Sequence, residues 1–186
     1  MQNTYSAGIS RSLNLAFTAL GAVLIAVCSW ISIPTAVPFT MQTFAVFFVL
    51  LALGGRRGTC SILVYILLGA AGMPVFSNFS AGAGVLLGAT GGYIAGFLLT
   101  GLIYWLFTRL LGQKTAVRVL GLLVGLLTLY AFGTLWYLAV YARTQGSAGL
   151  FTVLSWCVFP FVVPDLIKLE LALLLARRLA PALPRF

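Results

Sequence analysis

The residues best suited to chemistry lie together near the end of the chain, in the stretch Pro-Phe-Val-Val-Pro-Asp-Leu-Ile-Lys-Leu-Glu at 160–170. Its two acids, Asp165 and Glu170, are the only acidic residues of the chain. The surrounding sequence is apolar, and an ionisable group inside a membrane costs about 2.5 kcal/mol or more. Such groups usually face a cavity or a partner, so we expect a substrate site here.

The spacing separates the two acids. Asp165 and Lys168 are three positions apart and share one helix face. Glu170 follows Asp165 by five positions, about 140° around a helix of 3.6 residues per turn, so the acids cannot form a catalytic dyad. Two interpretations of Asp165 and Lys168 stay open: the pair neutralises itself inside the membrane, or a polar ligand uses both side chains.

The sequence offers little for catalysis. It has no histidine, no acid pair on one face and no GxxxxGK[ST] motif, which leaves few groups for acid–base chemistry or for holding a nucleotide with magnesium. Its three cysteines, Cys28, Cys60 and Cys157, are far apart and form no CxxC motif. We therefore predict no catalytic residues, no metal and no cofactor, and a protein that is not an enzyme.

Composition predicts the environment. The chain is 62% hydrophobic and only 7% charged, whereas soluble domains carry about 25% charged residues. A membrane span needs about 20 apolar residues, so we predict an all-α integral membrane protein, a single transmembrane domain over 1–186 with six spans. The six apolar segments are 11–32, 41–54, 58–72, 88–111, 116–141 and 150–180.

The sixth segment contains two prolines, Pro160 and Pro164. Proline suits the first turn of a helix and breaks its interior. We expect a broken segment with a new helix that starts near Pro164 and ends near Leu179. Asp165 would then lie in its first turn, with free backbone N–H groups nearby.

Basic residues predict the orientation by the positive-inside rule. With the N-terminus inside, only Arg143 falls in an outer loop, and both termini are cytoplasmic. The net charge of +9 comes from residues that flank apolar segments and form no contiguous patch, which argues for a lipid bilayer and against nucleic acid. The inner basic residues are Arg11, Arg56, Arg57, Arg109, Lys114, Arg118, Arg177, Arg178 and Arg185.

Two residues beyond the charged pair could contact a ligand. Asn78 lies in an outer loop, and its amide could both donate and accept hydrogen bonds, although a loop asparagine is more often a turn residue. Tyr93 follows two glycines, expected to permit close helix packing, and offers an aromatic wall with a polar tip. Other aromatic residues, Trp30, Trp105, Tyr130 and Trp156, are expected at the membrane interfaces.

The first helix carries a small-xxx-small pair, Ala22 and Ala26. Small residues let helices approach closely. Either this face packs inside the protein, or it is a docking face for another membrane protein.

Four stretches, in order along nearly the whole chain, resemble the BioY family, the biotin-specific substrate-binding components of energy-coupling-factor vitamin transporters. The family's usual Gly-Pro-Thr-Gly-Gly-Tyr has Ala89 in place of proline here. The stretches are Ile-Pro-Thr-Ala-Val-Pro-Phe-Thr-Met-Gln-Thr at 33–43, Gly-Gly-Arg-Arg-Gly at 54–58, Gly-Ala-Ala-Gly-Met-Pro-Val-Phe at 69–76 with Gly-Ala-Thr-Gly-Gly-Tyr-Ile-Ala-Gly-Phe at 88–97, and Phe-Pro-Phe-Val-Val-Pro-Asp-Leu-Ile-Lys at 159–168.

The resemblance implies a six-helix protein in a prokaryotic cell membrane that captures biotin from outside. It would act with a transmembrane coupling subunit and two ATP-binding subunits. By resemblance, the polar binding residues are Asn78, Asp165 and Lys168, with Tyr93 and the region of Gln42 lining the pocket. The alternative is a standalone carrier, perhaps proton-coupled through Glu170.

Overall fold

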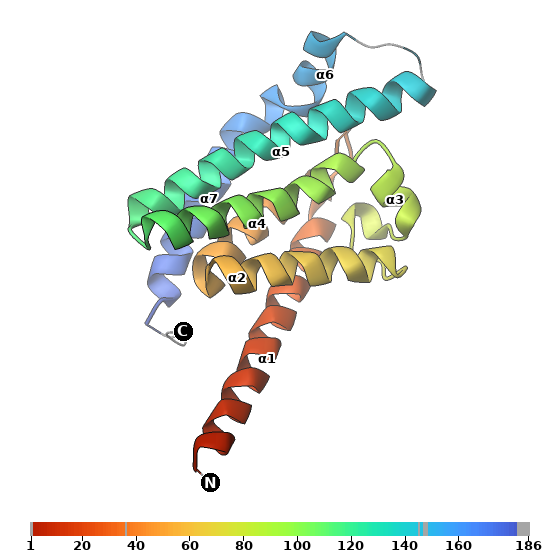
Figure 1. The fold of residues 1–186 in the computed structure, drawn as a ribbon. Coiled ribbons are helices and arrows are strands. Elements are labelled where there is room, and N and C mark those ends of the chain that lie inside the picture. The colour runs from red at the N-terminus through yellow and green to blue at the C-terminus, as the bar shows by residue number, and fades with distance from the viewer. Residues whose placement is uncertain (1, 36, 145, 147–148, 182–186) are drawn as a thin grey trace.

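The computed structural model describes residues 2–35, 37–144, 146 and 149–181, with side chains from residue 11 onward. Helices dominate (Figure 1), and five are long and apolar enough to cross a membrane. The long helices are α1 (Gln2–Trp30), α2 (Gln42–Ala70), α4 (Gly91–Leu111), α5 (Thr115–Thr144) and α7 (Phe159–Leu179), with α6 (Leu150–Cys157) leading into α7.

The connections contain short elements that the sequence did not predict. Strands β1 (Ser32–Ile33) and β2 (Phe39–Thr40) pair antiparallel and form a small hairpin between α1 and α2. A 3-10 turn η1 (Ser77–Phe79) and the short helix α3 (Ala83–Leu87) lie between α2 and α4. The predicted all-α architecture is confirmed for the long elements.

Helix α2 folds back on itself at Gly54. The backbone there has φ 79° and ψ 169°, a conformation that glycine adopts readily and other residues avoid. The Gln42 Nε2 atom donates to the Tyr65 hydroxyl at 2.9 Å, whereas a straight helix would separate these residues by about 35 Å. The two arms are therefore antiparallel, and they correspond to the predicted segments 41–54 and 58–72. Figure 1 shows this turn on the left.

The break in the last segment comes earlier than predicted. Helix α6 ends at Cys157, Val158 has φ −126° and ψ −59°, and α7 begins at Phe159 with Pro160 in its first turn. Pro164 lies inside α7. The expected helix start near Pro164 is wrong, and Asp165 is not in a first turn with free N–H groups. Pro160 fits the first turn because its missing N–H has no intrahelical partner to lose there.

Helices α4 and α5 pack closely through small residues. A Cβ atom added at Gly92 would lie 2.2 Å from the Trp136 Cβ, and one at Gly133 would lie 2.3 Å from the Tyr93 ring. The predicted role of the glycines before Tyr93 is thus confirmed for Gly92. The Thr100 hydroxyl also donates to the Gly125 carbonyl at 3.0 Å, which joins the two helices within the apolar core.

Helix α1 packs against α2 and its N-terminal half projects from the body in Figure 1. Ala22 is 2% exposed and Ala26 is 6% exposed. The chain itself covers both methyl groups, so the predicted docking face at these two positions is not supported. Internal packing, the other interpretation of the pair, accounts for their burial.

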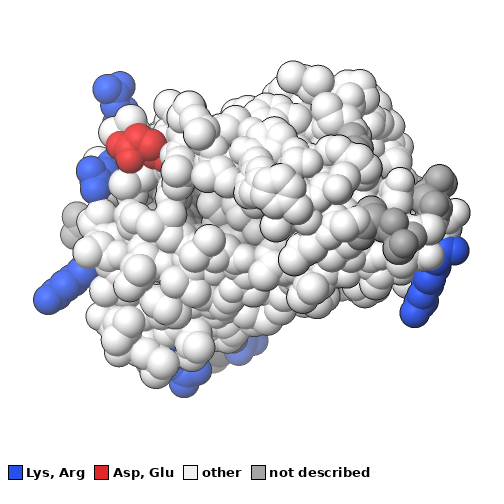
Figure 2. Space-filling model, turned by 90° about the horizontal axis from the view of Figure 1, so that it is seen from above, with Lys and Arg blue, Asp and Glu red and all other residues white. Residues whose placement is uncertain are grey.

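Charged side chains are rare on the middle part of the surface. Figure 2 shows most of the blue Lys and Arg atoms toward one end, a small blue group at the opposite end, and a wide uncharged surface between them. Exposed large apolar residues such as Leu127, Leu135 and Leu171 are common. An apolar belt of this kind suits contact with lipid chains.

The close contact between the turn of α2 and α4 gives a test of the fold. A Cβ atom at Gly55 would lie 2.6 Å from the Trp105 Cα, which is backbone and cannot move aside. We expect Gly55→Val to destabilise the purified protein by about 1–3 kcal/mol through overpacking. Thermal unfolding in detergent measures this. Gly84→Val is the control, because nothing lies within 4 Å of a Cβ at Gly84, and equal melting of the two variants would contradict the packing.

Candidate functional site

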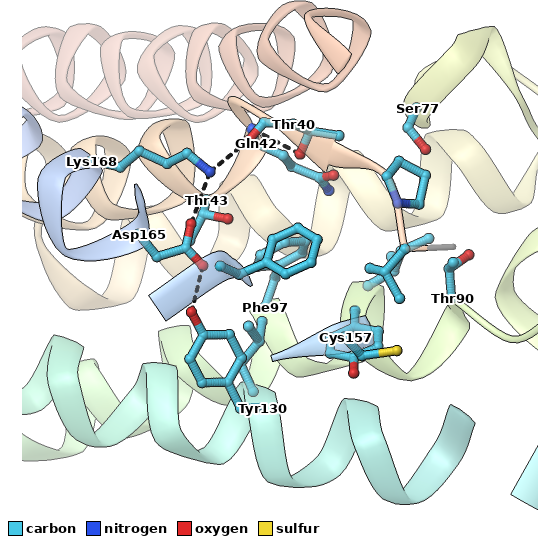
Figure 3. Close-up of a pocket in the computed structure, with 16 residues that line it drawn as sticks. Thr40, Gln42, Thr43, Ser77, Thr90, Phe97, Tyr130, Cys157, Asp165 and Lys168 are labelled. Carbon is cyan, nitrogen blue, oxygen red and sulfur yellow. Dashed lines mark hydrogen bonds and ion pairs between the residues drawn. The ribbon is translucent and has the colours of Figure 1, made fainter. Parts of the chain in front are cut away.

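A cavity of about 60 Å³ lies among the hairpin, the start of α2, α4, α5 and α7 (Figure 3). Its walls are mainly apolar, with polar groups gathered at its ends. The lining residues are Val37, Pro38, Thr40, Gln42, Thr43, Ser77, Thr90, Tyr93, Ile94, Phe97, Leu129, Tyr130, Cys157, Phe161, Asp165 and Lys168.

One end of the cavity holds a buried ion pair. The Lys168 Nζ donates to Asp165 Oδ1 at 2.8 Å, and the residues are 4% and 2% exposed. The same ammonium donates to the Thr40 carbonyl at 2.8 Å and lies 4.3 Å from the centre of the Phe39 ring. The predicted shared face of Asp165 and Lys168 is confirmed, and Phe161, four residues before Asp165, lines the cavity on the same face.

Tyr130 completes the group around the carboxylate. Its hydroxyl donates to Asp165 Oδ2 at 2.7 Å, so each carboxylate oxygen accepts a hydrogen bond from within the protein. The expectation that Tyr130 sits at the membrane interface is wrong, because it is only 8% exposed. Its position three residues before Gly133, on the face of α5 that packs against α4, was the available signal in the sequence.

Gln42 and Tyr93 also line this cavity. Gln42 opens α2 and its Nε2 is held by Tyr65 in the other arm of the fold-back. The Tyr93 hydroxyl lies 3.2 Å from the Thr134 Oγ1, so α5 fixes the position of the ring. In Figure 3 Ser77, Thr90 and Cys157 lie toward the end of the cavity opposite Lys168.

The BioY family model matches residues 1–185 of this chain. The chain belongs to the BioY family. It is 43% identical to the biotin transporter BioY of Thermotoga maritima over 88% of this chain and 90% of that protein. It is 37% identical to the biotin transporter BioY2 of Lactococcus lactis over 98% of this chain and 95% of that protein.

The fold also has a solved counterpart. The crystal structure of the S-component for biotin from an ECF-type ABC transporter matches with a TM-score of 0.80 and 24% sequence identity. The match covers 92% of this chain and 93% of that one. The likeness supports the helical membrane fold of this BioY chain.

Asn78, which the BioY resemblance implied as a binding residue, does not line the cavity. It is exposed, has φ 55°, and its Oδ1 accepts from the Ser32 hydroxyl at 3.0 Å. The neighbouring Ser77 lines the cavity instead. In this conformation Asn78 therefore joins the 77–79 turn to the hairpin.

Charge in the cavity is balanced. Asp165 and Lys168 offset each other, while Glu170 is exposed and absent from the lining. Among the described residues, no three His, Cys, Asp or Glu side chains lie close enough to hold a metal ion. This arrangement suits a ligand that is recognised by hydrogen bonds to donors and acceptors, enclosed by apolar walls.

The Tyr130 contact leads to a stability prediction. Tyr130→Phe removes one of two donors to a buried carboxylate, which should lower the free energy of unfolding by about 1–3 kcal/mol. Thermal unfolding without ligand measures this. Tyr141→Phe is the control, because Tyr141 also lies on α5 and is only partly buried. If both variants melt together, the hydrogen bond to Asp165 does not contribute as expected.

Proposed function

We propose that this chain captures biotin at an outward-facing site and is the substrate-binding subunit of an ATP-driven energy-coupling-factor importer. The observation that carries the proposal is the buried carboxylate of Asp165, held by Lys168 and Tyr130 at one end of a mainly apolar cavity. Family membership supports it, because the relatives in that family are named biotin transporters.

Biotin suits the groups in this cavity. Its urea ring offers two N–H donors and one carbonyl, and its tail ends in a carboxylate. Asp165 accepts a urea N–H in a charge-assisted bond, which is about twice as strong as a neutral one. The apolar middle of the cavity, with Ile94, Phe97 and Leu129, encloses the ring system. The tail extends toward the hydroxyl groups of Ser77 and Thr90.

The proposed partners rest on family membership and on the ECF-type ABC transporter to which the matching S-component belongs. Energy for uptake would then enter through separate subunits. These are one transmembrane coupling subunit and two ATP-binding subunits. The chain binds and presents biotin and performs no chemistry on it.

The chain forms one transmembrane domain of six spans in a prokaryotic cell membrane, with both termini cytoplasmic. The two antiparallel arms of α2 supply two of the spans, each shorter than the usual length of about 20 residues. The start of α1 and the end of α7 lie toward the same side of Figure 1. The alternation of basic residues supports this orientation.

A standalone carrier driven by protons is the competing function. It would need a titrating group that faces the ligand, and Glu170 is exposed outside the cavity. Uptake that depends on the ATPase subunits supports the importer. Uptake that survives their deletion and stops with a proton uncoupler supports the carrier.

Replacement of the carboxylate tests ligand recognition. We expect Asp165→Asn to lower biotin affinity at least about tenfold, or ~1.4 kcal/mol, because a charged acceptor becomes a neutral amide. Binding of labelled biotin to the purified protein measures this. Glu170→Gln is the matched control, since the same change is made to an acid outside the cavity. Normal binding by a folded Asp165→Asn protein would falsify this role for the carboxylate.

Labelling from outside the cell tests the orientation. In a variant with Cys28, Cys60 and Cys157 replaced, a membrane-impermeant maleimide should label Met73→Cys in whole cells. It should label Lys114→Cys only after the cells are opened. Both side chains are exposed, so access depends on the membrane side. The reverse pattern would rule out the outward-facing site.

A further inference from the structure

The hairpin of β1 and β2 forms the roof of the cavity at the end that holds the ion pair. Its strands have only two residues each, and the connection between them contributes Val37 and Pro38 to the lining. The other polar lining residues at this end lie on α2, α5 and α7. The hairpin is therefore the part of the wall with the least secondary structure of its own.

Lys168 joins this roof to α7. Its ammonium donates to the backbone carbonyl of Thr40 at 2.8 Å and lies over the Phe39 ring at 4.3 Å. Thr40 and Lys168 are 128 positions apart in the sequence. The contact therefore links the hairpin directly to the last helix. Asp165 holds the ammonium at 2.8 Å and fixes where it points.

The volume of the cavity shows why this contact matters. About 60 Å³ is free, whereas pockets for small molecules usually measure roughly 300–1,000 Å³. This difference in volume indicates that part of the wall moves when a ligand of the size of biotin enters. Movement of the Phe39–Thr40 strand away from α7 would break the bond between Lys168 and the Thr40 carbonyl.

We propose that Lys168 is a positioning residue that pins the hairpin over the cavity and so sets how slowly a bound ligand leaves. The ammonium has three donors, of which Asp165 and the Thr40 carbonyl take two. A ligand acceptor at the third donor stabilises the same closed arrangement. The effect on ligand exit rests on the proposed biotin function, but the pinning itself is a property of the ligand-free protein.

Accessibility of the roof tests the pinning without ligand. In the protein with its three native cysteines replaced, Val37→Cys reports hairpin opening, because Val37 is 8% exposed. We expect Lys168→Met to raise the rate of maleimide labelling at this position by roughly tenfold, since a buried hydrogen bond to a charged donor is lost. Lys114→Met, which removes an exposed lysine, should leave the rate unchanged. Equal rates in the two variants would overturn the proposal.

Two further variants separate pinning from loss of the ion pair. In Asp165→Asn the amide oxygen can still accept from Lys168, so the ammonium should stay beside the Thr40 carbonyl and labelling should stay slow even where biotin binding is weakened. Asp165→Asn combined with Lys168→Met removes the unpaired buried charge that could unfold the single Lys168 variant, and labelling should again be fast. If Asp165→Asn alone speeds labelling as much as Lys168→Met, the ion pair and not the contact with the hairpin closes the roof.

Kinetics of biotin binding connect the pinning to function. Lys168→Met should raise the dissociation rate about tenfold and change the association rate less than about threefold, as expected when retention and not encounter is affected. If the association rate of Lys168→Met instead fell about tenfold while its dissociation rate stayed unchanged, the proposed role of Lys168 in ligand retention would be overturned. If the unmodified protein binds no biotin while the labelling results hold, the proposed function fails and the pinning stands.

Discussion

The rest of the structure depends on the buried pair of Asp165 and Lys168. Taking two charges out of water costs several kcal/mol per ion, and their attraction repays this only when further hydrogen bonds satisfy them. Tyr130 satisfies the second carboxylate oxygen, and the Thr40 carbonyl accepts from the ammonium. The pair is therefore stable only where α5, the hairpin and α7 meet, which makes it the point at which these elements are held in register.

The interruptions in the helices bring residues to the point where α5, the hairpin and α7 meet. The fold-back at Gly54 brings both arms of α2 alongside α4 and α7 and puts Gln42 at the cavity. The break at Val158 lets Cys157 line the cavity from one helix and Phe161 from the next. Gly54 has a backbone conformation that other residues avoid, and Val158 lies two residues before Pro160; each interruption turns the chain toward the site.

Sequence alone predicted the elements that depend on local pattern. Asp165 and Lys168 stood out because charged residues are rare in the apolar segments. Their spacing of three positions predicted that they share one helix face. Tyr130 was missed because an aromatic ring with a polar tip suits both a membrane interface and a buried hydrogen bond. The hairpin was missed because strands of two residues are too short to show an alternation of polar and apolar residues. Ala22 and Ala26 were ambiguous because the same small residues suit packing within a chain and between chains, and only the position of α2 decides between these.

The balance of charge between Asp165 and Lys168 affects how a bound ligand can be released. A ligand can shift a conformational equilibrium only by the difference in its affinity for the two states. Charge-assisted bonds to a ligand in this cavity would favour the bound state and so oppose release to either side of the membrane. The two charged side chains that line the described cavity, Asp165 and Lys168, are paired with each other, and Glu170 is exposed outside it. Under the proposed function, release would be driven by an outside partner that distorts the site, and the hairpin joined to α7 through Lys168 is where a modest movement of helices would open it.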